Sequence, residues 1–564
     1  MRLGSVCVAI LLGSTLLGGA FGDRVLARGN ELGDHLRLYT AILGTIEDQY
    51  VDEVDSEELV AASIREMLRT LDPHSNFLQT REYSSLQERQ RGSYYGLGIT
   101  VQSIEGNITV VSPFEGTPAH RLGIRAGDVI SSIEGEDARG MSIDDAVKRL
   151  RGPKGSPVRI TIVRDGYDRP LDFTVIRDEI PLHSVPYYFK ADERTGYVRL
   201  VDFNETTACR PADPPGCANE LETALDELIQ EGAEGLILDI RDNPGGLLDQ
   251  AFAVSNLFLH KGQLVVFTRG RTRRDESNYV TEADSRFGEI PLVVLVSKHS
   301  ASASEIVAGA IQDHDRGLIV GEPTFGKGLV QTIMPLRNVR GYALALTTAR
   351  YYTPSGRSIQ RDYGTTAFED YVAARGRSGC GAHFGEAKLT DAGRKVYGGD
   401  GIAPDSCVEP DPPSRFVSSL LSRQVFLSFS HGYASQETAG EAEIDGTGSR
   451  PDAAQENVTL IDPDFEVDDA VWAAFAAFLA QQKVPFEPER LEAHREEIAQ
   501  HILEEVLRQV FGEGEARQRT LHWDPQMQRA LELMPRARAL LEDPEAYIAA
   551  TEGAESDKLA SRMP

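Results

Sequence analysis

Cysteine, tryptophan and positive charge are all scarce in this sequence. The 564 residues include only 5 cysteines and 2 tryptophans, and 58 basic residues face 87 acidic ones, for a formal net charge of −29. This acidic balance argues against nucleic acid and strongly anionic membranes as partners. No Cys-x-x-Cys pair or histidine cluster is present. A metal site is therefore the weaker interpretation of the cysteines.

Long apolar runs are missing after the first 22 residues. Residues 1–22 contain Arg2, an apolar run from Val6 to Leu17 and a small-residue end, which is the pattern of an export signal. The run is short for a membrane span, so the pattern favours a cleaved signal peptide, and an uncleaved anchor is the alternative. We therefore expect a periplasmic or secreted protein, with the membrane as a partner only if the segment stays uncleaved.

Four cysteines follow that segment: Cys209, Cys217, Cys380 and Cys407. An even number of cysteines in an exported protein favours disulfides. Three pairings are open, and proximity along the chain favours Cys209–Cys217 and Cys380–Cys407. Metal binding is the alternative.

The stretch from Pro291 to Gln331 organises the chain. A short apolar run, Leu292 to Val296, predicts a buried strand, and a small-residue turn from His299 to Ser304 leads into a helical pattern. A strand that breaks sharply into a helix presents its turn residues at the carboxyl edge of the sheet, where open α/β folds bind ligands. The first N–H groups of such a helix are unpaired and point to the same place.

A second predicted strand, Gly317 to Gly321, leads to a glycine-flanked lysine, Lys327, with Gln331 four residues further on. A serine hydroxyl needs a neighbouring base to become a good nucleophile. Lysine is a base only as the neutral amine, so its pKa would have to fall by several units from about 10.4, which desolvation can do. The plainer alternative is that the serines cap a helix and Lys327 is a surface amine.

The motifs HSASASEI and GEPTFGKGLVQ together closely resemble the C-terminal processing peptidases, the tail-specific serine proteases of the S41 type. The resemblance implies that Ser302 is the nucleophile, that Lys327 is the base and that Gln331 orients the lysine. It implies no cofactor, no metal and no nucleotide. One departure is Lys298-His299, where the family usually has Asn/Lys-Gly before the serine run.

A glycine pair follows another predicted strand, Leu236 to Ile240. Glycines let backbone N–H groups approach a ligand closely, which suits an oxyanion hole. The stretch D-x-R-x-N-x-G-G around it resembles the family segment that faces the nucleophile. We expect the oxyanion hole to use the N–H of Gly245 or Gly246 together with that of Ala303. A bare turn is the alternative.

Residues 92–179 resemble a PDZ domain, with short strands, glycine turns and an AGDVI motif ending at Ile130. Such a module binds a peptide as an added strand and holds its carboxylate on loop N–H groups. The helix at residues 141–150 would wall the groove. A purely structural β-domain is the alternative. The expected substrate-binding loop consists of Gly96, Leu97, Gly98 and Ile99.

The fold class we predict is mixed α/β: a crotonase-like serine protease core with an inserted PDZ domain, N-terminal helices and a helical C-terminal region. The resemblance covers about residues 40–410. Helices at 468–482 and 491–511 are expected to pack on the body or on a partner chain. The expected divisions are a signal peptide at 1–22, an N-terminal helical region at 35–91, the PDZ domain at 92–179, the protease core at 180–410, and a helical C-terminal extension at 411–564 with a disordered linker at about 434–456.

The function predicted is a serine endopeptidase that cleaves exported proteins near their C-termini with a Ser/Lys dyad, after the PDZ domain captures the tail. Its partners would be protein or peptide C-termini, and a homo-oligomer or an adaptor protein is also open. Two alternatives are a catalytically inactive PDZ scaffold and a Ser/Lys amidohydrolase acting on non-peptide amides.

Overall fold

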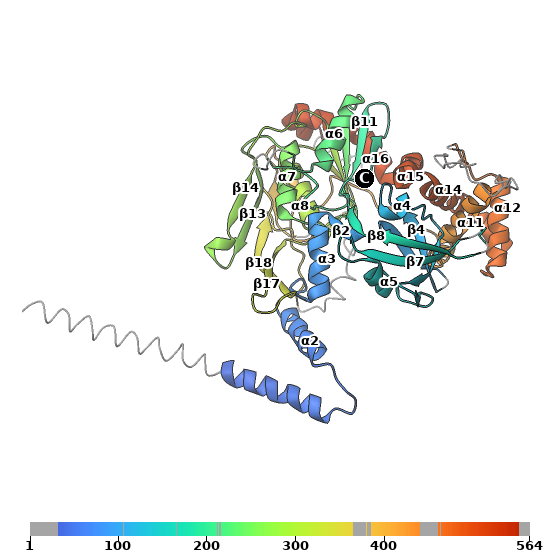
Figure 1. Cartoon of the computed structure of the whole chain (residues 1–564). Coiled ribbons are helices and arrows are strands. Elements are labelled where there is room, and N and C mark those ends of the chain that lie inside the picture. Colours follow the sequence, from blue (N-terminus) through green and yellow to red (C-terminus); the bar gives the residue numbers. More distant parts are fainter. Residues whose placement is uncertain are drawn as a thin grey trace, which may run out of the picture. The chain divides into compact units, whose positions relative to one another are not determined.

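A computed structural model describes most of the chain (Figure 1). The predicted signal peptide at 1–22 lies outside the described residues, as does most of the predicted linker. Residues 434–439 of that linker instead end a helix, α11. Within the described part of the chain, no helix combines the length and the apolar character needed to cross a bilayer. The described residues are 32–104, 106–164, 166–167, 169–210, 213, 216–364, 379–380, 385–439, 461–462 and 464–551.

The described chain divides into two compact units, and the smaller one combines residues 32–79 with residues 333–346. Residues 32–49 are helical. Helix α2 (Ser56–Arg69) begins at Asp55, whose side chain accepts two backbone N–H groups of the first turn. Strand β1 (Asn76–Leu78) then pairs antiparallel with residues 343–345. Ala61, Leu68 and Phe77 form the small core of this unit.

The larger unit is built around a six-stranded sheet. Its order is β10-β11-β12-β15-β16-β21, with β10 antiparallel and the other strands parallel. Both β12 and β15 are fully buried, as expected for strands covered on both faces. The strands are β10 (Tyr188–Lys190), β11 (Thr195–Arg199), β12 (Gly235–Asp239), β15 (Leu292–Val296), β16 (Leu318–Gly321) and β21 (Ser406–Cys407).

Helices cover both faces of this sheet. Leu236, Leu238 and Val294 pack on one face against α6 (Glu220–Gln230), α7 (Leu248–Phe258) and α8 (Ala303–Asp313). Because successive side chains of a strand point to opposite faces, Ile237, Val293 and Leu295 face the other way. They pack against α16 (Pro525–Glu542), a helix of the C-terminal extension. The extension therefore supplies one of the three layers of the core.

A second sheet contains the strand that follows the lysine motif. Strand β13 (Leu264–Gly270) pairs antiparallel with β14 (Ser277–Val280) and with residues 349–352 of β18 (Ala343–Tyr352). Strand β17 (Leu329–Pro335) pairs with β18 as well. A short 3-10 helix, Arg273–Asp275, lies in the β13–β14 turn, and β19 (Ala387–Leu389) with β20 (Lys395–Tyr397) forms a separate hairpin.

The PDZ segment folds around its own apolar core. Helix α3 (Thr80–Arg91) precedes it, and β2 (Ser93–Gly96) pairs antiparallel with β9 (Asp178–Pro181), so the two ends of the segment meet. Its sheet has the order β3-β4-β5-β7-β8, with β6 paired to β5. Its remaining elements are β3 (Ile99–Ile104), β4 (Asn107–Pro113), α4 (Pro118–Arg121), β5 (Val129–Ile133), β6 (Glu136–Asp137), α5 (Ile143–Leu150), β7 (Pro157–Val163) and β8 (Leu171–Ile176).

The C-terminal extension is helical and has a core of its own, in which Phe426, Phe429 and Phe475 are buried together. The helix predicted at 468–482 is α12, and the one predicted at 491–511 is divided at His494 between α13 and α14. Its elements are α10 (Arg415–Leu421), α11 (Val425–Ala439), α12 (Asp469–Gln481), α13 (Pro488–Ala493), α14 (Arg495–Phe511), α15 (Glu513–Thr520), a 3-10 turn (Leu521–Trp523) and α16.

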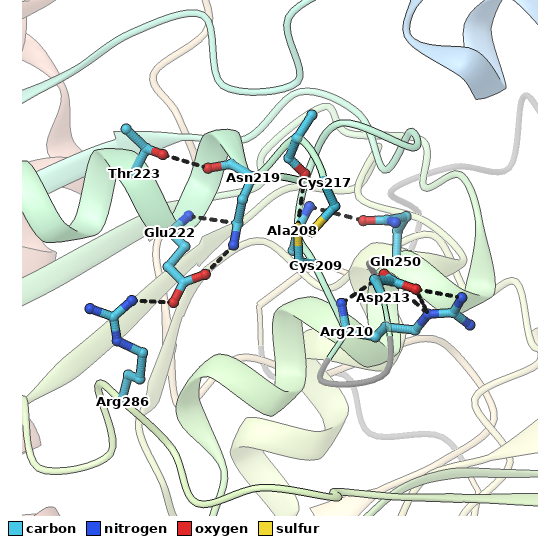
Figure 2. Close-up of a disulfide and its surroundings, with 11 residues drawn as sticks. Ala208, Cys209, Arg210, Asp213, Cys217, Asn219, Glu222, Thr223, Gln250 and Arg286 are labelled. Carbon is cyan, nitrogen blue, oxygen red and sulfur yellow. Dashed lines mark hydrogen bonds and ion pairs between the residues drawn. A yellow bond between two sulfur atoms is a disulfide. The ribbon is translucent and has the colours of Figure 1, made fainter. Parts of the chain in front are cut away.

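Two disulfides lie within the larger unit, and both are the pairs predicted from proximity. Cys209–Cys217 and Cys380–Cys407 have Cα–Cα separations of 6.1 and 5.6 Å. Figure 2 shows the first bridge beside the start of α6, where the N–H of Ala208 donates to the side chain of Gln250 on α7. Cys380–Cys407 attaches its loop to the edge strand β21.

Candidate active site

Ser302 lies at the junction between β15 and α8, in a strained backbone conformation. It is the N-cap of α8, with φ 57° and ψ −112°. A positive φ is rare for a residue with a side chain, and such strain persists only where the surrounding structure holds it in place. The turn therefore projects this one serine out of the strand-to-helix path.

The other two serines of the run have structural roles. Ser300 is fully buried and donates to the carbonyl of Ile240 at 2.8 Å. Ser304 is also fully buried and donates to the carbonyl of Asn243 at 2.9 Å. Ser302 is partly exposed. Of the three hydroxyls, that of Ser302 is the one open to a substrate.

A buried carboxylate, Glu305, joins the serine turn to the lysine loop. One oxygen of Glu305 accepts the N–H of Ser302 at 2.8 Å and the N–H of Lys327 at 2.9 Å. The other accepts the hydroxyl of Thr324 at 2.6 Å and the N–H of Gly326 at 2.7 Å. Glu305 is fully buried. Burial raises its pKa to about 7, although all four donors favour the charged form.

Tyr351 bridges the same two segments from the side of β18. Its hydroxyl lies within hydrogen-bond distance of the carbonyl oxygens of Ser302 and Lys327. The side chain is almost fully buried. The backbones of the predicted nucleophile and the predicted base are thus held together by two separate groups, one acidic and one phenolic.

The lysine loop itself requires glycine. Gly326 has φ +85°, and a Cβ there would lie 2.9 Å from the side chain of Arg361. Gly328 donates its N–H to Gln360 at 2.8 Å. The side chain of Lys327, between them, is partly exposed.

Gln331 lies on β17, four residues after Lys327. It is partly buried, and its amide donates to the hydroxyl of Thr347 on β18 at 3.4 Å. This bond attaches the side chain to the neighbouring strand. The predicted role of Gln331, to orient the lysine, stays a prediction.

The glycine pair packs directly against the serine turn. Gly245 has φ +94°, and a Cβ there would lie 2.6 Å from the carbonyl oxygen of Ala301 and 2.8 Å from the amide nitrogen of Ala303. Its N–H already donates to the side chain of Asn243 at 2.9 Å. Among the described residues, the N–H of Gly246 has no acceptor within hydrogen-bond distance. Ala303 is the first residue of α8, where an N–H has no partner within the helix.

Asn243 holds the glycine pair in place. It is fully buried, and its carbonyl accepts the N–H of Ala301 at 3.0 Å as well as the hydroxyl of Ser304. Its amide donates to the carbonyl of Leu200 at 3.0 Å. One residue therefore fixes the glycine loop, the serine turn and the end of β11 relative to one another.

A buried ion cluster lies at the start of the same loop. The guanidinium of Arg241 donates to both carboxylate oxygens of Asp239, and Arg199 donates to Asp239 at 2.8 Å. Burial alone would raise the pKa of Asp239, but Arg241 and Arg199 outweigh it and hold the pKa well below its usual range. The two guanidinium groups therefore favour the charged form of Asp239.

A cavity of about 1000 Å³ opens at the carboxyl edge of the central sheet, where α/β folds bind ligands. Asp242 and the segment Ser297–His299 line it from the loops after β12 and β15. Arg517 and Trp523 of the C-terminal extension line it as well. The serine turn therefore begins at the wall of a cavity that the extension also lines.

The predicted groove of the PDZ domain is present as a pocket between β3 and α5. Three of the four predicted loop residues, Leu97, Gly98 and Ile99, line it, whereas Gly96 ends strand β2. Strand β3 is an end strand of its sheet, which leaves an edge for an added strand. The other lining residues are Tyr94, Val101, Val147, Leu150 and Arg151.

Gly98 has a structural role besides the predicted one. It has φ +77°, and a Cβ there would lie 2.3 Å from the side chain of Thr117. Its carbonyl accepts the N–H of Phe114 at 2.8 Å and the hydroxyl of Thr117 at 3.1 Å. Replacing Gly98 would therefore disturb the fold of the domain as well as any bound peptide.

Three residues of the site were missed at the level of sequence: Glu305, Asn243 and Tyr351. Glu305 stands three residues after Ser302, which is the spacing of a capping box and could have marked it. Asn243 lies inside the D-x-R-x-N-x-G-G stretch. No local pattern marks Tyr351, because strand pairing brings it to the site. Among the described residues, no group of three or more His, Cys, Asp or Glu side chains could hold a metal ion.

Two known domain families match parts of this chain. Residues 194–367 match peptidase family S41, and residues 109–164 match the PDZ domain. A carboxy-terminal-processing protease of Bartonella bacilliformis is 43% identical over 325 residues, which are 58% of this chain and 72% of that protein. The carboxy-terminal processing protease CtpA of Bacillus subtilis is 36% identical over 318 residues, 56% of this chain and 65% of that protein.

Among solved structures, the photosystem II D1 C-terminal processing protease is 28% identical, with a TM-score of 0.34 over 66% of this chain and 92% of that one. The extent and identity of the sequence matches, together with the two domain matches, settle the relationship: this chain belongs to the carboxy-terminal processing proteases of peptidase family S41.

Proposed function

We propose that the chain is a serine endopeptidase in which Ser302 and Lys327 form the catalytic dyad. The observation that carries the proposal is the shared carboxylate of Glu305, which accepts N–H groups from both residues. It fixes a partly exposed serine and a lysine against one buried group. Preorganisation of this kind is what acyl transfer requires.

The reaction would follow from the groups at the site. Ser302 Oγ attacks the peptide carbonyl while the neutral amine of Lys327 takes the hydroxyl proton. The carbonyl oxygen becomes an oxyanion that receives N–H groups from Ala303 and Gly246. Collapse of this intermediate breaks the C–N bond, and the lysine returns its proton to the leaving amine. Water then attacks the acyl-enzyme by the same route and releases the new C-terminus.

The oxyanion hole in this proposal uses Gly246 rather than Gly245. The N–H of Gly245 is engaged by Asn243, so it would have to break that bond to serve a substrate. Gly246 lies close to the carbonyl group of Phe203, and this close packing fixes its position. The sequence resemblance also leads us to propose a crotonase-like core. On the same resemblance, we propose that Gln331 orients the lysine.

Substrate capture is assigned to the PDZ domain. The free edge of β3 and the apolar wall of α5 suit an extended peptide, whose C-terminal carboxylate would meet the loop N–H groups at Leu97 to Ile99. Exported proteins are the substrates we propose, and the periplasm or the exterior is the location, because residues 1–22 have the pattern of an export signal.

The test compares the three serines. Ser302→Ala should lower peptide cleavage by roughly 10³-fold or more, because dyad members act as a unit. Ser300→Ala and Ser304→Ala each remove a buried structural hydrogen bond, so they should lose stability and keep most of the activity.

Lys327→Arg should be as inactive as Lys327→Ala, since arginine stays protonated.

A serine-reactive probe separates this function from the alternatives. The enzyme should be labelled at Ser302, whereas an inactive scaffold would not react. Peptides with free and with amidated C-termini should differ in cleavage if tails are captured. Substantial peptide cleavage by the Ser302→Ala protein would place the nucleophile elsewhere.

A further inference from the structure

The helix that covers the far face of the central sheet starts at a contact with Arg241, the residue that begins the glycine loop. Asp524 is the N-cap of α16, and its Oδ1 accepts the N–H groups of Gln526 and Met527 at 3.0 and 3.1 Å. This use of an aspartate is common, because it satisfies N–H groups that have no partner within the helix. It involves only one of the two carboxylate oxygens.

The second oxygen of Asp524 reaches the protease core. Its Oδ2 accepts a hydrogen bond from Arg241 at 2.7 Å, and it also pairs with Arg517 of α15. The side chains of Asp524 and Arg241 are only 9% and 11% exposed. Such a pair is shielded from solvent and salt, so it holds its geometry better than a surface ion pair does.

Arg241 is fixed from both sides. Its Nε donates to Asp239 at 3.0 and 3.1 Å, while its Nη1 donates to Asp524 and to the side chain of Gln526, the latter at 2.9 Å. A guanidinium is planar and rigid, so anchors at its two ends define where the residue lies. Gln526 is in turn bonded to the carbonyl of Val408 at 2.8 Å.

The position of Arg241 affects the glycine loop, because this residue begins it. Asn243 comes two residues later, and Gly246 comes three residues after Asn243. Asp242, between Arg241 and Asn243, has φ 55° and shares two hydrogen bonds with the Ser297 side chain, at 2.9 and 3.0 Å. The loop is short and already strained, so a displacement of Arg241 would be transmitted to its glycines.

We propose that Asp524 is a positioning residue of the active site: through Arg241 it fixes the loop Arg241–Gly246 relative to Ser302. The inference rests on the proposed function of that loop as part of the oxyanion hole. It makes the C-terminal extension a contributor to turnover, with no contact between the extension and the scissile bond.

The two roles of Asp524 can be separated. Asparagine and serine are about as good as aspartate at an N-cap, so Asp524→Asn and Asp524→Ser keep the start of α16 and remove the charge that faces Arg241. Asp468 provides a matched control. It is the exposed N-cap of α12 and also accepts two N–H groups, and within the described residues it makes no ion pair.

The experiment measures kcat and KM for a short peptide, the rate of labelling by a serine-reactive probe, and the thermal midpoint. For Asp524→Asn we expect kcat and the labelling rate to fall about 10- to 100-fold, the loss that a displaced site of about 1 Å produces, with KM changed less than about twofold. Asp468→Asn should stay within about twofold of the wild type in every kinetic constant.

If Asp524 only anchors the helix, Asp524→Asn would lower the thermal midpoint and leave kcat unchanged, and that result overturns the proposal. An equal loss of kcat in Asp468→Asn overturns it as well. The labelling rate refers to the folded fraction alone, and Asp524→Ser repeats the test with a different cap, so partial unfolding does not obscure the answer. If the wild type itself neither cleaves peptides nor reacts at Ser302, the proposed function fails, whatever Asp524→Asn does.

Discussion

The serine turn and the PDZ groove handle the same peptide on our proposal, and they are built in opposite ways. The serine turn is braced by buried polar groups, Glu305 and Asn243, each of which bonds to several backbone atoms. The groove is lined mainly by apolar side chains, such as Val101 and Val147, beside an unpaired strand edge. Chemistry needs atoms held in place, whereas capture of a strand needs an edge left open.

Removing the carboxylate of Glu305, which braces the serine turn, should have the largest effect. Glu305→Ala deprives the N–H groups of Ser302, Gly326 and Lys327 of the buried acceptor that they share, at a cost of up to about 1–3 kcal/mol each. We expect kcat for a short peptide to fall about 10³-fold. The control is Glu222→Ala, which removes a glutamate from the same position in the first turn of α6. Equal losses in the two variants would refute a special role for Glu305.

The protonation of Glu305 gives a second test. Its pKa is raised to about 7 in the folded protein, against about 4.5 for an ordinary glutamate. The folded state therefore binds the proton more tightly, and this group's contribution to stability is complete below about pH 4.5 and lost as the pH rises to 7. Relative to Glu305→Gln, the unfolding free energy of the wild type should fall by about 3 kcal/mol across that window.

Denaturant melts of both proteins at closely spaced pH values measure this difference. A difference that is flat between pH 4.5 and 7 would contradict the raised pKa. The same titration should appear in catalysis, since a protonated Glu305 can no longer accept all four hydrogen bonds. Activity carried by the charged form should decline below about pH 7 in the wild type.

A charge in the groove should affect capture and leave chemistry intact. Val147→Asp places a carboxylate in the apolar wall of α5, and we expect KM for tailed substrates to rise about tenfold with kcat for a short peptide unchanged. Val163→Asp introduces the same residue at an exposed position of β7, outside the groove, and should have no effect. A matching loss of short-peptide turnover in Val147→Asp would mean that the groove also controls the active site.

The smallest effect is expected at the rim of the groove. Arg151 Nη1 lies 2.7 Å from Glu88 Oε2, and its guanidinium carbon lies 4.3 Å from the centre of the Tyr94 ring. The side chain of Arg151 is 41% exposed. Exposed pairs contribute about 0–1 kcal/mol. Arg151→Gln should therefore shift the unfolding free energy by less than about 1 kcal/mol and KM by no more than a few-fold. A tenfold rise in KM would instead make Arg151 a direct ligand of the substrate carboxylate.

Motifs with fixed local spacing could be predicted from the sequence, and contacts made across the fold could not. The strand, turn and helix around Ser302 follow from an apolar run and small residues, and the lysine loop follows from its glycines. The hydrogen bond from Gly245 to Asn243 depends on how the loop turns back on itself. Spacing alone therefore could not decide which of the two glycines, Gly245 or Gly246, serves the oxyanion hole. Asp524 lies more than 280 residues from Arg241, and only the packing of α16 on the sheet brings them together.

The C-terminal extension also illustrates a limit of resemblance. The motifs end near residue 410, and the amphipathic patterns beyond that point predict helices without saying what they cover. The buried face of α16 matches a sheet face whose strands, β11 to β16, alternate between two cores. A strand shows alternating apolar and polar residues in its sequence only when one of its faces is polar, and both faces of these strands are apolar.

The position of α16 has a consequence for how the protein is made. Ile237, Val293 and Leu295 are synthesised well before residues 525–542, which form the helix that covers them. Until residues 525–542 have left the ribosome, one face of the central sheet has no partner of its own, and contacts of such long sequence separation form late. Synthesis must therefore pass residue 542 before this core can close, and shortening the gene to the region of the motifs would leave a sheet without its cover.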